Sequence, residues 1–355
     1  MCRSHPIFCI LPPHLLRSVC DHGSARQRAW ALKTLLTDST FRALRAALAP
    51  PAPAAARHRR SVVEEGQKQR TIYSARNEET LPGIAVRMEG APPSGNAAVD
   101  EAYDGLGHTF DMYWEVYERN SIDDEGLPLD ATVHYGTDYN NAFWNGQRMV
   151  FGDGDGDLFN RFTVSIDVIG HELTHGVVED EAQLIYFFQP GALNESNADV
   201  FGSLVKQKLR NQTVQEADWL IGDGLFTSQI QGVALRSMKA PGTAYDDPLL
   251  GKDPQPAHMR DYVRTFEDNG GVHINSGIPN HAFYQAAMAI GGHAWDKAGR
   301  IWYETLRDSR LRPNASFSRF ARLTIDNAAR LYGSGSAEQK AVRHGWAEVG
   351  IRPGK

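Results

Sequence analysis

The chain has 355 residues, of which 41% are hydrophobic and 23% are charged, and its formal net charge is −6. This composition is that of a soluble globular protein, long enough for two domains and an appendage. No apolar run reaches the roughly 18 residues that a membrane span needs. The apolar stretch 7–16 is interrupted by Pro12 and Pro13 and lacks a small-residue cleavage site. We therefore expect no membrane span and no Sec signal peptide, so that synthesis takes place in the cytoplasm.

The charges are unevenly distributed along the chain. Residues 1–60 hold ten Lys and Arg against two Asp and Glu, a formal charge of +8, whereas residues 61–355 hold 27 against 41, a formal charge of −14. A nucleic-acid-binding protein would carry its positive charge on the folded domain, so we expect no nucleic acid partner. The asymmetry instead favours docking of the basic segment on the acidic body.

All three cysteines, Cys2, Cys9 and Cys20, lie in the basic segment. An odd number of cysteines in one short segment gives no disulfide framework and fits a reducing compartment. Two interpretations are open. The side chains are small buried hydrophobic groups, which we favour, or one thiolate occupies a metal site in a latent form of the protein.

Apolar residues at helical spacing predict one or two amphipathic helices within residues 14–48. The segment 49–60 that follows is low in complexity and combines proline with arginine, as expected of an exposed linker that proteases can reach. We therefore place the main boundary of the chain near residue 60.

From residue 70 to about 165, short β-like runs such as 71–73, 131–135 and 148–151 are separated by Gly, Asn, Asp and Pro. One helix is predicted in this region, Asp104–Asn120, and its aromatic face is interpreted as core. The second half of the chain is mostly helical. Its predicted helices are 165–179, 194–210, 275–292, 294–308, 316–330 and 336–346. The pattern predicts an α+β fold.

The helix predicted at 165–179 carries a His-Glu-Leu-Thr-His motif that begins at His171. His171 and His175 share one helix face and can bind one ion, and Glu172 lies one position further round, where it can approach a water on that ion. Glu195, twenty residues after His175, begins the next predicted helix, and Asp199 follows one turn later on the same face. The spacing predicts a zinc site of His171, His175 and Glu195 that Asp199 supports from behind.

Three protein ligands leave the fourth zinc position to water, which is the arrangement of a catalytic rather than a structural site. Transfer of a proton from that water to Glu172 creates a nucleophile near neutral pH, while the metal polarises the carbonyl under attack. Peptide hydrolysis follows naturally, although this site alone equally allows other amides.

Further blocks of sequence accompany this motif and make the chain resemble the thermolysin family of neutral zinc metalloproteases (peptidase M4, gluzincins). The blocks are Tyr139-Asn-Asn-Ala-Phe-Trp-Asn-Gly146, Gly191-Ala-Leu-Asn-Glu195, Arg236-Ser-Met238 and Asp268-Asn-Gly-Gly-Val-His-Ile-Asn-Ser-Gly277. Within the family, Leu11-Pro-Pro-His-Leu-Leu and Asp21-His-Gly-Ser24 resemble the short propeptide of the protealysin type. The resemblance spans nearly the whole chain.

The resemblance implies a two-lobed fold with the active-site cleft between the lobes. Residues 1–60 are then a propeptide with its linker, 61–180 a β-rich N-terminal catalytic lobe that includes the zinc helix, and 181–355 an α-helical C-terminal lobe. It also implies that His273 and Tyr186 stabilise the oxyanion of the tetrahedral intermediate. Asp268 is implied to hold the imidazole of His273 in one tautomer and charge state.

Three residues are implied to hold the substrate main chain. Asn141 and Ala142 would bind it beside the sheet edge, and Arg236 would bind the carbonyl of the residue after the scissile bond. Four apolar residues match the family's pocket for the side chain that follows the cut, and they imply a preference for a bulky hydrophobic residue there. These four are Phe159, Phe162, Val168 and Leu235. From sequence alone they could equally be ordinary core.

The sequence departs from long-studied members of the family at their calcium ligands. Asp167, Asp218 and Asp223 match ligand positions, but Lys206 stands where those relatives place a glutamate shared by two ions, and Leu220 replaces another acidic residue. A lysine ammonium can take the place of a cation among carboxylates. We therefore expect at most one Ca²⁺ beside a single catalytic Zn²⁺.

The sequence thus predicts a monomeric zinc endopeptidase made as a zymogen, which cleaves proteins or peptides before bulky hydrophobic residues and is inhibited by its own propeptide. Metzincins are excluded, because they need a third histidine where this chain has Glu181. A zinc aminopeptidase would need acidic groups for a substrate N-terminus, and no such motif is evident. A non-catalytic peptide-binding zinc protein would not need Glu172, Tyr186 and His273. Secretion by a leaderless route is a hypothesis.

Overall fold

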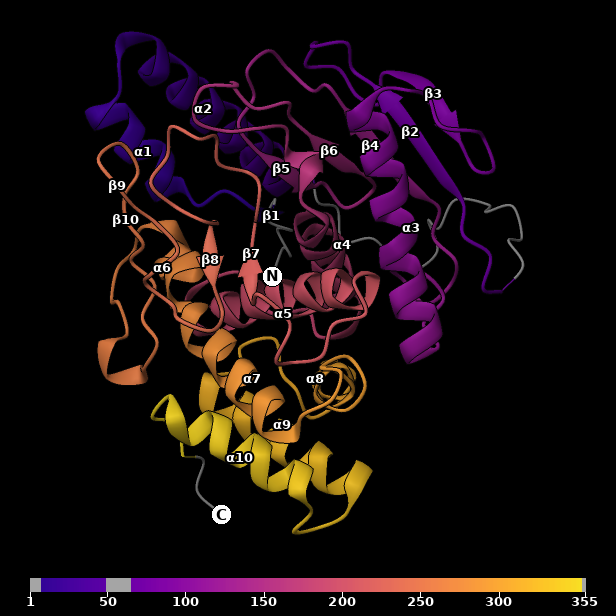
Figure 1. Cartoon of the computed structure of the whole chain (residues 1–355), viewed down its shortest axis with the longest axis vertical. Coiled ribbons are helices and arrows are strands. Elements are labelled where there is room, and N and C mark those ends of the chain that lie inside the picture. The colour runs from indigo at the N-terminus through magenta and orange to yellow at the C-terminus, as the bar shows by residue number, and fades with distance from the viewer. Residues whose placement is uncertain (1–7, 49–64, 353–355) are drawn as a thin grey trace.

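The computed structural model describes residues 8–48 and 65–352. A mixed β-sheet lies toward one end of the long axis and a group of helices toward the other, with the long helices α4 (Ile166–Glu181) and α5 (Phe188–Leu209) in the middle (Figure 1). The arrangement confirms the predicted α+β, two-lobed fold. The boundary predicted near residue 60 lies outside the described residues.

The N-terminal segment forms the short strand β1 (Phe8–Cys9) and the helices α1 (Pro13–His22) and α2 (Ala25–Leu48). The two helices agree with those expected within residues 14–48. Proline suits the first turn of α1, where a backbone N–H would lack a partner within the helix. One face of α1 is buried through Leu15, Leu16 and Val19, which join the main hydrophobic core. The described part of the basic segment therefore packs on the body, as predicted, and the face of α1 that it buries is apolar.

The six-stranded sheet has the order β1-β5-β6-β4-β2-β3. Its other strands are β2 (Arg70–Ser74), β3 (Ile84–Met88), β4 (Leu129–Val133), β5 (Ala142–Trp144) and β6 (Met149–Phe151). β4 pairs in parallel with β2 and β6, and the other pairs are antiparallel. The N-terminal segment thus supplies an edge strand, β1, that extends the sheet beyond β5.

The helix predicted at Asp104–Asn120 is α3 (Ala97–Tyr117), so the prediction was wrong at both ends. The side chain of Asn96 caps the earlier start by accepting a hydrogen bond from the amide of Val99, and Glu118 ends the helix in the left-handed conformation. The aromatic residues Tyr113 and Tyr117 are buried, which confirms their interpretation as core.

α5 begins at Phe188, six residues before the predicted start. Pro190 falls in its first turn, where no backbone N–H is required, and therefore does not interrupt the helix. The remaining helices are α6 (Asp268–Asn275), α7 (Gly277–Ile290), α8 (Ala298–Leu306), α9 (Phe317–Tyr332) and α10 (Ala337–Glu348). Among the helices that the structure describes, none combines the length and apolarity needed to cross a membrane.

α6 was not predicted as a separate helix. Asn269, Gly270 and Gly271 have positive φ, so the chain makes a tight left-handed turn before His273. Such a conformation suits glycine and asparagine but breaks the helical pattern that sequence reasoning looks for.

Candidate active site

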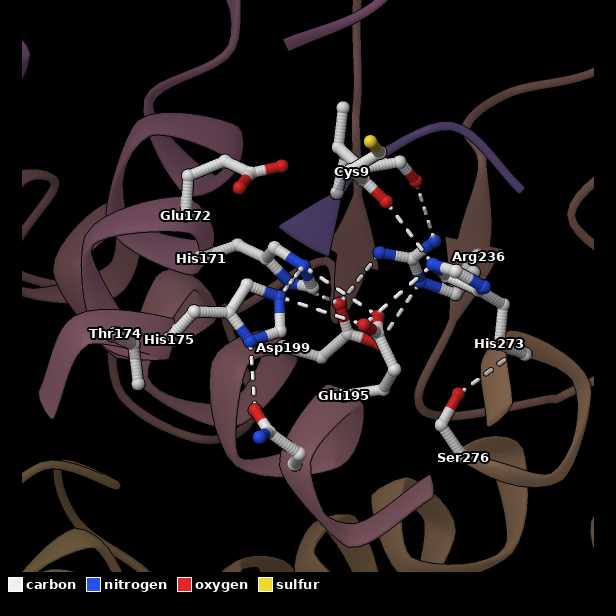
Figure 2. Close-up of polar contacts among 12 residues, drawn as sticks. Cys9, His171, Glu172, Thr174, His175, Glu195, Asp199, Arg236, His273 and Ser276 are labelled. Atoms are coloured by element: carbon white, nitrogen blue, oxygen red, sulfur yellow. Dashed lines mark hydrogen bonds and ion pairs between the residues drawn. The ribbon is translucent and has the colours of Figure 1, made fainter. Parts of the chain in front are cut away.

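Three buried side chains from α4 and α5 converge on one point (Figure 2). The Nε2 atoms of His171 and His175 lie 3.0 Å apart. The carboxylate of Glu195 lies 3.6 Å from Nε2 of His171 and 3.5 Å from Nε2 of His175. All three ligand atoms lie within 4.8 Å of one another. The structure therefore brings together the predicted metal-binding residues.

The hydrogen bonds behind these ligands fix which ring nitrogens face inward. Nδ1 of His171 lies 2.8 Å from a carboxylate oxygen of Asp199, and Nδ1 of His175 lies 2.7 Å from the side-chain oxygen of Asn194. Both oxygens accept, so each Nδ1 carries a proton and the two Nε2 lone pairs point at each other. Burial and the neighbouring His171 hold the pKa of His175 well below its ordinary value, so the ring is neutral, as a metal ligand must be.

The donor set fits zinc. Oε2 of Glu195 is buried, and no hydrogen-bond donor among the described residues reaches it. A buried carboxylate oxygen and two converging lone pairs are costly unless a cation lies between them. Two histidines and one carboxylate, with a further position open, are the ligands of a catalytic zinc.

Asp199 lies behind the ligands, as predicted. Besides His171 it binds the guanidinium of Arg236 through two hydrogen bonds of 2.9 and 2.8 Å, and Nδ2 of Asn280 donates to it at 2.8 Å. Burial alone would raise the pKa of Asp199, but the charge of Arg236 and the contact with His171 outweigh it and lower the pKa. The carboxylate therefore stays charged, and Arg236 is held rigidly beside the metal ligands.

Glu172 projects from α4 beside the metal ligands and is completely buried. The backbone amide of Trp144 donates to it at 3.1 Å, and the amide of Ile10 contacts the same carboxyl group. Burial, followed by the charge of Glu195, raises the pKa of Glu172 well above its ordinary value. A carboxyl group in this environment takes up a proton readily.

His273 and Tyr186 face the same space from the other side. The hydroxyl of Tyr186 donates to Glu195 and lies 3.2 Å from Nε2 of His273. Nδ1 of His273 lies 2.6 Å from Asp268. Burial opposes the charge on His273, but the charges of Asp268 and Glu195 outweigh it and raise its pKa to about 9. At neutral pH the ring therefore carries a positive charge and donates from both nitrogens.

The N-terminal segment lies against these residues. Nε2 of His273 lies 3.0 Å from the carbonyl oxygen of Cys9, and Arg236 donates to the carbonyl of Ile10 at 3.1 Å. The amide of Ile10 donates to the carbonyl of Ala142 at 3.3 Å. The residues predicted to hold a substrate are therefore engaged by the chain's own backbone.

The amide of the next residue, Leu11, donates to Oδ1 of Asn141 at 3.1 Å. The amide nitrogen of the Asn141 side chain is held by helix α2, because Asp38 accepts a hydrogen bond from Nδ2 of Asn141 at 2.8 Å. Asp38 also accepts one from the hydroxyl of Tyr139 at 2.5 Å. Asp38 is only 2% exposed. Nearer the surface, Arg17 pairs with Glu267 at 2.7 Å.

The four residues predicted to form an apolar pocket are buried, and they belong to the same hydrophobic cluster as Ile10. These are Phe159, Phe162, Val168 and Leu235. Cys9 packs in a second cluster with Phe143 and Val150. The interpretation of Cys9 as a buried hydrophobic group is therefore confirmed, whereas Cys2 lies outside the described residues.

The predicted calcium residues do not all come together. Nζ of Lys206 lies 2.7 Å from Asp167 and 2.9 Å from Asp218, and it donates to the carbonyl of Leu220 at 2.7 Å. Asp223 makes no contact with this group in the described part of the chain. The ammonium of Lys206 thus takes the central position among the carboxylates.

Sequence reasoning missed several residues that support the site. Asn194 directly precedes Glu195 in a block already singled out, so its position was available as a signal. Asp38 is one of only two acidic residues in the basic segment 1–60, which also marks it. Asn280 lies in an ordinary helical pattern, and nothing in the sequence distinguishes it.

Comparisons with known proteins identify the family. Two family models match, "Thermolysin metallopeptidase, catalytic domain" over residues 61–179 and "Thermolysin metallopeptidase, alpha-helical domain" over residues 182–351. An "Extracellular metalloprotease" of Pectobacterium carotovorum subsp. carotovorum is 54% identical over 349 residues, which cover 98% of each chain. "Protease PrtS" of Photorhabdus sp. (strain Az29) is 57% identical over 285 residues, 80% of this chain and 76% of the relative.

A solved structure is also similar over nearly the whole chain. It is the "Precursor of Protealysin, Metalloproteinase from Serratia proteamaculans", which has 54% sequence identity and a TM-score of 0.88, and the match covers 97% of this chain and 99% of that chain. Together with the buried His-His-Glu group, these matches show that the chain belongs to the thermolysin family of zinc metalloendopeptidases.

Proposed function

We propose that this protein is a zinc endopeptidase made as an inhibited precursor, which cleaves protein substrates before bulky hydrophobic residues and uses Glu172 to activate the attacking water. The observation that carries this proposal is the placement of Glu172 and His273 on two sides of the His171–His175–Glu195 group (Figure 2).

Zinc, when bound, supplies a Lewis acid for the substrate carbonyl and acidifies a water molecule. Glu172 takes a proton from the attacking water and returns it to the leaving nitrogen. Its raised pKa supports this role, because the protonated carboxyl must persist until the proton is delivered. His273 and Tyr186 donate hydrogen bonds to the charge that develops on the carbonyl oxygen. Asp268 keeps His273 charged for this purpose.

The proposed inhibition rests on residues 9–11, which occupy the main-chain contacts of a substrate. Three features hold this segment in place: strand pairing with β5, the buried face of α1, and Asp38 on α2. Because attachment is intramolecular, the segment competes with substrates at a high effective concentration. Access to the cleft then requires removal of residues 1–60.

The proposed specificity rests on four buried apolar residues, Phe159, Phe162, Val168 and Leu235. An apolar pocket selects a bulky hydrophobic side chain through the area it buries, with about 1–3 kcal/mol per methylene discriminated. We also propose that Lys206 replaces one calcium ion, that the protein binds at most one Ca²⁺, and that the enzyme acts as a monomer.

Cleavage mapping tests this function. The full-length protein is treated briefly with trypsin, which can cut the arginine-rich linker at 57–60, and is then incubated with an unrelated denatured protein. We expect new N-termini to begin with Leu, Ile, Phe or Val, and a zinc chelator to abolish them. The proposal is wrong if Glu172→Gln protein, treated in the same way and containing zinc, cleaves at an undiminished rate.

A further inference from the structure

The N-terminal segment crosses the cleft in a defined register. Two consecutive carbonyl groups of this segment meet two different partners: His273 contacts the carbonyl of Cys9, and Arg236 contacts the carbonyl of Ile10. In the proposed function, His273 faces the carbonyl under attack and Arg236 binds the carbonyl of the following residue. The bond between Cys9 and Ile10 therefore occupies the position of a scissile bond.

The amide groups give the same register. The amide of Ile10 donates to the carbonyl of Ala142 and also contacts the carboxyl of Glu172. This nitrogen is the one that would leave on cleavage, and Glu172 is the group proposed to protonate it. The segment runs antiparallel to β5, with Phe8 opposite Trp144 and Cys9 opposite Phe143. The main chain thus lies as an extended substrate would lie on a sheet edge.

The side chains agree with this assignment. Ile10 is completely buried in the main hydrophobic core, to which Phe159, Phe162, Val168 and Leu235 also belong, whereas Cys9 packs in a smaller cluster. Ile10 is a bulky hydrophobic residue, which is the type proposed to follow the cut. The segment therefore presents both the main-chain and the side-chain features of a substrate.

We propose that the protein hydrolyses its own Cys9–Ile10 peptide bond while the segment is docked. This inference rests on the proposed function, because it uses the same groups on a bond within the chain. One water adds its oxygen to the carbonyl carbon of Cys9, the bond to the nitrogen of Ile10 breaks, and Glu172 passes the proton of the water to that nitrogen. After the new carboxylic acid loses the second proton of the water to the amine, the products are a carboxylate at Cys9 and an ammonium group at Ile10.

This cut leaves the cleft covered. The contacts that hold the segment from its C-terminal side survive: Ile10 with Arg236, Leu11 with Asn141, and Asp38 with Asn141. The buried face of α1 also remains. Among the described residues, the released part carries the pairing of β1 with β5, the contact of the Cys9 carbonyl with His273 and the packing of Cys9 with Phe143 and Val150. The nicked protein is thus still inhibited, and a later cut in the linker opens the cleft.

The test is to incubate the purified full-length protein with zinc and follow its intact mass and N-terminal sequence. We expect loss of residues 1–9 and a new N-terminus Ile-Leu-Pro-Pro, at a rate that does not change when the protein is diluted about twentyfold, because a reaction within one chain is first order. Glu172→Gln protein is expected to stay intact. A rate that falls in proportion to dilution would overturn the inference.

Two matched variants separate recognition of the bond from docking of the segment. Ile10→Ala and Leu15→Ala both remove a buried apolar side chain of the N-terminal segment, but only Ile10 follows the bond. We expect Ile10→Ala to slow the cut by at least about tenfold relative to Leu15→Ala, since pocket contacts act on the transition state. Equal rates for the two variants contradict the assignment.

The trypsin-treated protein serves as the reference for activity. If the trypsin-treated protein cleaves an external peptide in the same buffer in which the full-length protein leaves its Cys9–Ile10 bond intact, the inference is wrong and the proposed function stands. If the full-length protein leaves its Cys9–Ile10 bond intact and the trypsin-treated protein also fails to cleave the external peptide, the proposed function itself fails.

Discussion

Helices α4 and α5 carry residues of two separate groups that each bind a positive charge, and the two groups differ in the source of that charge. At the first, the ligand atoms of His171, His175 and Glu195 lie within 4.8 Å of one another, and this group contains neither a lysine nor an arginine. At the second, the ammonium of Lys206 lies between Asp167 and Asp218. The first place therefore needs a metal, and the second carries its own cation within the chain.

The difference follows from what each place has to do. A buried carboxylate must be compensated, by a metal or by a side-chain cation. A lysine satisfies this requirement permanently and leaves no open position, so it suits a structural role. A metal with three protein ligands keeps a position open for chemistry. The comparison predicts that changes at the first place abolish activity, whereas changes at the second affect stability.

The largest expected effect is that of Glu172→Gln, beside the His171–His175–Glu195 group. The substitution keeps the shape of the side chain but removes the base, so we expect kcat of the trypsin-treated protein to fall by about 10²–10⁴-fold. Zinc content should be unchanged, because Glu172 is not among the ligands. Peptide cleavage and zinc analysis on the same sample check this. Loss of zinc together with activity would mean that Glu172 holds the metal site.

Lys206→Met should mainly destabilise the protein. It leaves the fully buried Asp167 without its cation, and breaking such a pair costs about 3–5 kcal/mol of unfolding free energy. Lys208→Met is the matched control, since Lys208 lies two residues further on α5 and pairs with the exposed Glu115, a contact worth about 0–1 kcal/mol. Denaturant unfolding measures both. Equal losses would contradict the comparison.

A smaller effect on stability, which depends on pH, is expected from the pairing of Asp218 with Lys206. Burial would raise the pKa of Asp218, but the charge of Lys206 and the backbone amide of Leu220 outweigh it and lower the pKa. An acid with a lowered folded-state pKa stabilises the fold above its unfolded pKa, and this contribution disappears as pH falls through the folded value. Asp218→Asn should therefore cost about 1–3 kcal/mol near neutral pH, and the difference from wild type should shrink below about pH 4. Melting temperatures from pH 3 to 7 test this, and a pH-independent difference would refute it.

The smallest expected effect is that of calcium at this place. The ammonium of Lys206 occupies the position between Asp167 and Asp218. We therefore expect that neither adding millimolar calcium nor removing it with EGTA changes the thermal stability that these three residues provide. The control is Lys206→Glu, which removes the ammonium and adds a carboxylate, and whose melting temperature we expect to rise with calcium. If EGTA lowers the melting temperature of the Lys206→Met protein as much as that of wild type, calcium binds elsewhere in the chain.

Much of the catalytic centre could be predicted because its residues follow helix periodicity. His171 and His175 are four apart on α4, and Glu195 and Asp199 are four apart on α5, so local geometry alone pairs them. The expectation that Lys206 replaces a cation came from the family resemblance, and the two salt bridges agree with it.

What the sequence did not reveal depends on contacts distant along the chain. The two-residue strand β1 has no periodic signal, and only its pairing with β5 defines it. The contact of Asp38 with Asn141 joins residues 103 positions apart. The left-handed turn before His273 arises from Asn269, Gly270 and Gly271, which look like a loop in sequence. Tertiary contacts, rather than local preference, decide these features.

The most direct test of the zinc centre is to measure activity against zinc content in one preparation. The trypsin-treated protein is stripped of metal stepwise, and each sample is analysed for zinc and for cleavage of a peptide with an internal Leu. We predict that activity falls in proportion to bound zinc, reaches zero in the metal-free protein, and returns when one equivalent of zinc is added back. Full activity in protein that contains no zinc would contradict the account.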